Sequence, residues 1–259
     1  MGHQDDTGEA TSHSRLSSPK MARDVLLLLL SAAAGCIDAL SYLGLGHVFT
    51  ANMTGNTVLL GIALGQMQGE EALRGGAALA GFVLGVAGGA AIAERKLEGR
   101  CVWPRAVTWI LTFELVVMVA FASGFYLAGG EPVGEARYVL ITLSAVAMGA
   151  QSTAVRSLGV GGVATTYVTG TLTNLTEQVV SRLWWTLSST ERGEQRPERA
   201  SSSERALLIP AQVWLVYGLG AVVGGAAMLW WSSAATVWVP VVLVALVVAG
   251  AALRFRNPQ

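Results

Sequence analysis

The sequence predicts an all-α integral membrane protein with about six transmembrane helices plus two re-entrant or broken half-helices, arranged as an inverted internal repeat. Three observations lead to this prediction. Hydrophobic residues make up 53% of the chain and charged residues only 13%, a balance typical of membrane proteins rather than soluble domains. Six apolar runs are long enough to cross a bilayer core of ~30 Å. A stretch rich in glycine and threonine near the N-terminus also returns in the second half.

The first 22 residues are polar, and we expect them to form a disordered cytoplasmic tail. The apolar run that follows is too long for the core of a signal peptide, so it is interpreted as an uncleaved first span. The six predicted spans are residues 25–45, 75–93, 107–127, 138–155, 207–231 and 237–253.

The repeated stretch organises the two halves. Residues 35–61 read GCIDALSYLGLGHVFTANMTGNTVLLG, and residues 149–175 read GAQSTAVRSLGVGGVATTYVTGTLTNL. Matching Thr50 to Thr165 gives an offset of 165 − 50 = 115 residues, and one inserted residue brings Gly35 onto Gly149. Each copy is an apolar helix, a glycine-rich break, a Thr-Gly pair and a new helix. The first membrane repeat is therefore placed at 23–128 and the second at 137–254.

Two short helical pieces follow the Thr-Gly pairs, at 55–66 and 171–185. The first is only ~18 Å long at 1.5 Å per residue, which is short for a span. If both pieces return to the side they came from, every Lys/Arg cluster lies in the cytoplasm, including the connector 188–205. This arrangement puts both termini inside and makes the halves inverted copies. The alternative is a longer, bent segment 46–66 that crosses as a broken helix.

Broken segments at matching places in two halves point to a substrate site near the middle of the bilayer. Helix N-termini there suit an anion or a carboxylate, and neutral side chains would add hydrogen bonds to a polar solute. The alternative is that these groups only cap the half-helices and satisfy the broken backbone. The candidate substrate-binding residues are Thr50, Asn52, Thr54, Gly55, Asn56, Thr165, Thr166, Thr169, Gly170 and Gln151.

Ionisable side chains inside spans are costly and are candidates for function. Asp38, about two thirds of the way along the first span, is the first candidate for a proton- or cation-coupling carboxylate, and Glu114 is the second. The alternatives are that Asp38 bonds to Ser41 or a neighbouring helix, and that Glu114 pairs with a basic residue such as Arg156.

The stretch GCIDALSYLGLGHVFTANMTGN, followed later by GAQ, VR and TTYVTGTLT, resembles the YoaK-like bacterial membrane proteins, catalogued as domain of unknown function 1275. The resemblance covers roughly residues 23–253. It implies a bacterial inner-membrane protein of about six spans, and it implies nothing about substrate. The family pattern Gly-x-Gln-Asn has Ser152 in the Asn position here.

Three classes of function follow. The first is a secondary transporter of a small polar or anionic solute in the cell (inner) membrane, with a proton or cation as coupling partner. The second is a passive channel on the same repeat, and the third is a membrane scaffold without transport activity. No Ser/His/Asp set, HExxH motif or metal-ligand cluster indicates an enzyme or a cofactor. The zero net charge indicates no nucleic-acid partner, and the remaining expected partners are the lipid bilayer and a second copy of the chain in a homo-oligomer.

Overall fold

The computed structural model describes residues 19–94, 102–159 and 200–255, together with 172–173, 176–177, 179–181 and 183–184; in 200–207 it describes the backbone only. The helices are α2 (Pro19–Gly44), α3 (Met53–Gly65), α4 (Gly69–Glu94), α5 (Arg105–Leu127), α6 (Gly134–Ser157), α8 (Ala200–Trp230), α9 (Ser233–Thr236) and α10 (Trp238–Arg254). The described part of the chain contains no strand. The prediction of an all-α fold is confirmed.

Six helical segments are long and apolar enough to cross a membrane: Pro19–Gly44, Gly69–Glu94, Arg105–Leu127, Gly134–Ser157, Leu208–Trp230 and Ser233–Arg254. They coincide with the six predicted spans. The helices extend beyond the apolar runs because backbone hydrogen bonding continues into polar residues. Residues 19–22, which we assigned to the tail, therefore belong to α2, and residues 200–205 of the predicted connector begin α8.

Helix α2 packs tightly and in parallel against α8. A methyl group placed on Gly35 would lie 1.9 Å from the Tyr217 carbonyl oxygen, and one on Gly220 would lie 2.2 Å from the Ala32 carbonyl oxygen. Only glycine permits two helix backbones to approach this closely.

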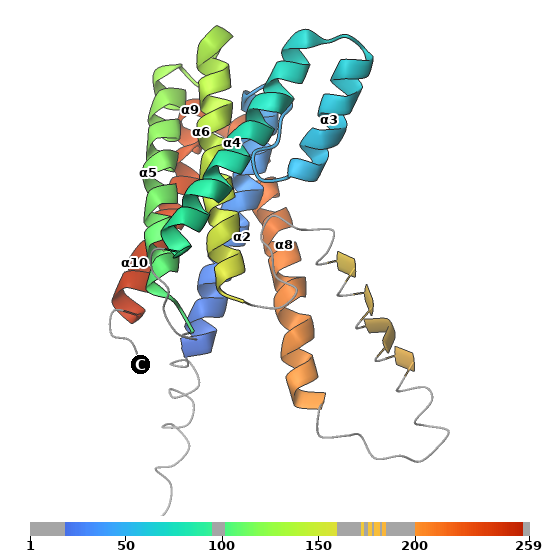
Figure 1. The fold of residues 1–259 in the computed structure, drawn as a ribbon, viewed down its shortest axis with the longest axis vertical. Coiled ribbons are helices and arrows are strands. Elements are labelled where there is room, and N and C mark those ends of the chain that lie inside the picture. The colour runs from blue at the N-terminus through green and yellow to red at the C-terminus, as the bar shows by residue number, and fades with distance from the viewer. Residues whose placement is uncertain are drawn as a thin grey trace, which may run out of the picture.

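Helix α4 packs against α6 in the same manner. A methyl group on Gly149 would lie 2.2 Å from the Phe82 carbonyl oxygen, and one on Gly85 would lie 2.0 Å from the Val146 carbonyl oxygen. The direction of this parallel pair is opposite to that of α2 and α8, as the course of the ribbon shows (Figure 1).

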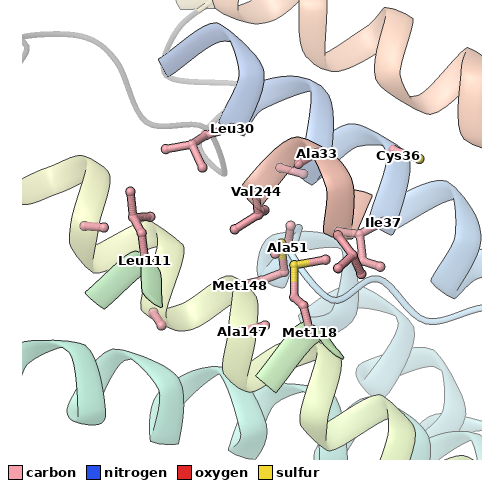
Figure 2. Packing of buried hydrophobic residues seen from close by; sticks show 14 of the residues in the cluster. Leu30, Ala33, Cys36, Ile37, Ala51, Leu111, Met118, Ala147, Met148 and Val244 are labelled. Carbon is pink, nitrogen blue, oxygen red and sulfur yellow. The ribbon is translucent and has the colours of Figure 1, made fainter. Parts of the chain in front are cut away.

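The hydrophobic core lies where α2, α5, α6 and α10 meet. Its fully buried members include Leu30 and Ile37 of α2, Met118 of α5, Met148 of α6 and Val244 of α10 (Figure 2). The core joins helices of both halves of the chain, so neither half packs as a separate domain.

Helix α3 stands apart from this core. It lies along the first part of α4, where the Cβ atom of Leu60 is 3.4 Å from a methyl position on Gly75 (Figure 1). Its 13 residues span ~20 Å, less than the ~30 Å of a bilayer core. The chain enters α3 from within the bundle and leaves it at the end where α4 begins. The described half-helix thus has the course that we predicted for a re-entrant segment.

Candidate functional site

The break between α2 and α3 begins where α2 meets glycine. The amides of Leu45 and His47 donate to the carbonyls of the last turn of α2 at 2.9 and 3.0 Å. Gly46 then has a φ of 90° and His47 a φ of 61°. Glycine adopts this left-handed region freely, whereas histidine rarely does. The two positive φ angles reverse the chain and direct it back into the bundle.

Asp38 of α2 holds the loop tip, which we define as residues 50–52. Its Oδ1 atom accepts the backbone N–H groups of Thr50 at 2.8 Å, Ala51 at 2.7 Å and Asn52 at 3.4 Å. Its Oδ2 atom accepts the hydroxyl of Tyr217 in α8 at 2.6 Å. Four donors surround a side chain that is only 3% exposed. Charge-assisted hydrogen bonds of this kind offset the cost of burying a carboxylate.

The position of Asp38 also gives the depth of the loop tip. Asp38 lies six residues before Gly44, the last residue of α2. At 1.5 Å per residue, the tip returns ~9 Å along α2 into the bundle. The bond from Asp38 to a neighbouring helix, which is the alternative to a coupling role, is present through Oδ2, and Oδ1 holds the loop tip. The coupling role of Asp38 stays a prediction.

The Thr50 hydroxyl links the loop tip to two further helices. Its Oγ1 atom lies 3.0 Å from Ser41 Oγ in α2 and accepts the Ser144 hydroxyl of α6 at 2.9 Å. All three side chains are buried, and Thr50 is fully so. The loop tip is thereby attached to α2, α6 and, through Asp38, α8.

The start of α3 is satisfied by its own motif. The Asn52 side chain accepts the amide of Gly55 at 3.2 Å, as an N-cap does. The Asn56 side chain accepts the Phe49 amide at 2.9 Å and donates to the Phe49 carbonyl at 2.5 Å. A methyl group on Gly55 would lie 3.0 Å from the Phe49 ring. In this conformation these groups perform the capping that we weighed as the alternative, and their contact with a solute remains a prediction.

Thr54 differs from the rest of the motif. It lies in the first turn of α3 and is exposed, and its hydroxyl makes no hydrogen bond to the described residues. Thr57, one turn later, is also exposed but donates to the Met53 carbonyl at 3.0 Å. Thr54 therefore offers a ligand an exposed hydroxyl that makes no hydrogen bond within the described part of the chain.

The second motif contributes Thr165, Thr166, Thr169 and Gly170, and all four lie outside the described residues. Gln151 precedes that motif in α6 and is fully buried. Its Nε2 atom donates to the Leu30 carbonyl at 3.1 Å. Leu30 is eight residues before Asp38, so Gln151 lies ~12 Å from the Asp38 level along α2.

Glu114 occupies the interior of α5 and is fully buried. Neither of its carboxyl oxygens has a hydrogen-bond partner among the described residues. The alternative of a pair with a basic residue such as Arg156 is not found among the described residues, where Arg156 lies exposed at the end of α6. Asp38 and Glu114 are not brought together by any contact between them.

Sequence reasoning missed Tyr217 and Arg74. Tyr217 is a lone hydroxyl in a glycine-rich apolar run, and that isolation was the available signal. The Arg74 side chain is 12% exposed and lies over Gly46, where a methyl group would be 3.1 Å from Arg74 Cδ. It faces Glu70 at 3.8 Å and Glu71 at 3.7 Å, and its buried Nε has no hydrogen-bond partner in the described part of the chain. The sequence feature that could have identified Arg74 is that it is a single basic residue soon after the broken segment.

Comparison with known proteins finds a matching family and a similar protein. The model of a family described as "Protein of unknown function (DUF1275)" matches residues 26–250. The chain is similar to the "UPF0700 transmembrane protein YoaK" of Bacillus subtilis (strain 168), with 36% identity over 240 residues, 92% of this chain and 97% of the relative. No solved structure matches the chain.

Proposed function

The chain belongs to the DUF1275 family of multi-pass membrane proteins, and on that premise we propose that it is a secondary transporter. The cargo is a small polar or anionic solute, and the chain lies in the cell (inner) membrane of a bacterium with both termini in the cytoplasm. It acts as a carrier without a catalytic step. The second Thr-Gly motif resembles the first in sequence, and we propose that it forms the other half of the substrate site.

The observation that carries the proposal is a non-helical loop tip held inside a membrane bundle. Exposed backbone N–H and C=O groups are not tolerated in lipid, so such a segment persists only within protein or beside a watery cavity. Here a buried carboxylate and a buried threonine hydroxyl hold the tip. Secondary transporters use broken segments of this kind to place helix ends at their substrate.

The glycine contacts support the inverted repeat. Gly35 and Gly149 differ by 149 − 35 = 114 residues, and their contacts Tyr217 and Phe82 differ by 217 − 82 = 135. The second pair of contacts has the same offsets, since Ala32 and Val146 differ by 146 − 32 = 114, and Gly220 and Gly85 differ by 220 − 85 = 135. Two repeats related by inversion explain why the same glycine contacts occur twice, in two helix pairs that run in opposite directions.

The described half of the site offers a solute two kinds of group. Thr54 presents an exposed hydroxyl, without a hydrogen-bond partner among the described residues, at the N-terminal end of α3, where the helix dipole is positive. Arg74 supplies a largely buried positive charge beside the same loop, and its ion pairs at 3.7 and 3.8 Å are long. Both groups favour a solute that carries hydrogen-bond acceptors or negative charge.

The test is a thermal-shift screen of the purified full chain with small polar metabolites and inorganic anions. A ligand that binds only the folded state at a hundred times its dissociation constant adds ~2.7 kcal/mol of stability. We expect Thr54→Val to lose the shift and Thr57→Val to keep it, because Thr57 donates to its own helix. A shift that is equal in both variants contradicts the proposed site.

Flux into liposomes then separates the transporter from its alternatives. Flux of the stabilising solute that follows an imposed proton or sodium gradient supports the transporter. Flux that is indifferent to such a gradient identifies the passive channel. An absence of both shift and flux leaves the scaffold as the function.

A further inference from the structure

Glu114 lies in α5, the helix Arg105–Leu127, and not in the break between α2 and α3. Glu114 is fully buried, and so are Leu111 one turn before it and Met118 one turn after it. Both neighbours belong to the apolar cluster that also contains Met148 of α6 and Val244 of α10 (Figure 2). Glu114 thus places a carboxyl group on the face of α5 that is directed into the core.

No opposite charge within the described residues compensates this carboxyl group. Glu114 lies more than two turns from either end of α5. The other titratable and charged residues of α5 lie within two turns of an end of that helix. The same is true of such residues on the helices that pack against α5. These residues are Arg105 and Tyr126 of α5, Glu70, Glu71, Arg74 and Glu94 of α4, Glu135, Arg137, Tyr138 and Arg156 of α6, and Arg254 of α10. The short helix α9 contributes none. Helix α2, which packs on α6 and α10, carries Asp38 in its interior, and the bonds of Asp38 are made to the loop tip and Tyr217.

A charged carboxylate without partners is strongly disfavoured in such surroundings, whereas a protonated one is tolerated. We propose that Glu114 is a proton-binding site of this protein, and that in the proposed transporter it takes up and releases the proton that drives transport. The carboxylate takes the proton from water, so that one of its oxygens forms an O–H bond. This bond breaks when the proton returns to water. The assignment to a coupling role rests on the proposed transporter, whereas the proton site itself does not.

The two buried acids, Asp38 and Glu114, differ in what a bound proton would disrupt. Asp38 is occupied by four donors, so a proton bound there would displace the bonds that hold the loop tip. Glu114 has no such bonds to any residue that the structure describes. A proton can therefore bind to Glu114 without disrupting a hydrogen-bond network.

The test is infrared spectroscopy of the purified full chain at neutral pH, with selective ¹³C labelling of glutamate carboxyl groups. We expect a C=O stretching band of a protonated carboxylic acid that shifts with the glutamate label. Glu114→Gln should abolish this band. The matched control Glu135→Gln should keep it, because Glu135 is exposed in the first turn of α6.

The absence of such a band in the labelled wild type overturns the proposal, as does a band that survives Glu114→Gln. Labelling the wild type keeps the test decisive even if the variant fails to fold. The outcome is separate from that of the transporter proposal. Gradient-driven solute flux that persists in Glu114→Gln removes the coupling role and leaves the transporter intact, whereas a Glu114 band in a protein that moves no solute does the reverse.

Discussion

Asp38 and Glu114 are both acidic side chains buried inside membrane helices, yet their surroundings are opposite. Asp38 is 3% exposed and accepts hydrogen bonds from three backbone amides and one tyrosine. Glu114 is fully buried and accepts none from the described residues. The comparison teaches that burial alone does not assign a role to an intramembrane acid. The hydrogen bonds of Asp38 hold the loop tip, whereas Glu114, the proposed proton site, receives no such bonds from the described residues.

The largest expected effect comes from Asp38→Asn. The amide removes the charge and turns one acceptor into a donor, which then faces either the loop amides or the Tyr217 hydroxyl. Hydrogen bonds to a charged group contribute ~1.5–3 kcal/mol each, so we expect a loss of about 3 kcal/mol. Thermal unfolding in detergent measures this loss. Wild-type stability in Asp38→Asn would show that the loop tip does not depend on the carboxylate.

Glu114→Met is expected to raise the stability of the protein, whereas Asp38→Asn lowers it. A methionine of similar size removes two oxygens that have no hydrogen-bond partner among the described residues, and an unsatisfied buried polar group costs ~1–3 kcal/mol. We expect the variant to gain about 1 kcal/mol in the same unfolding assay. A marked loss of stability would indicate that Glu114 is held by a partner, and the contrast with Asp38 would then fail.

A loss of stability no larger than the gain expected for Glu114→Met is expected from Tyr217→Phe. This variant removes one donor from Asp38 and leaves the three backbone amides in place. We expect a loss of about 1 kcal/mol. A double-mutant cycle with Asp38→Asn should show that the two losses are not additive, because the residues share one hydrogen bond. Additive losses would mean that Tyr217 acts on stability independently of Asp38.

Several features of this protein could be predicted from the sequence because they depend on local composition and spacing. The apolar runs predict all six spans, since a helix must bury its backbone polar groups to cross lipid. The glycine break and Thr-Gly pair predict a half-helix at 55–66, and α3 occupies 53–65. Asp38 stood out because an acid inside an apolar run is costly.

Only the tertiary structure decided what those residues contact. Asp38 meets the loop tip 12 to 14 residues later and Tyr217, 179 residues later, and no local pattern encodes that second pairing. Thr50 and Thr54 look alike in the sequence, yet one is buried between Ser41 and Ser144 and the other is exposed. Glu114 shows the same limit, because its lack of partners among the described residues depends on which faces of α4, α6 and α10 close around it. Hydropathy and spacing determine which segments enter the membrane, whereas the partner of each polar group depends on how the helices pack.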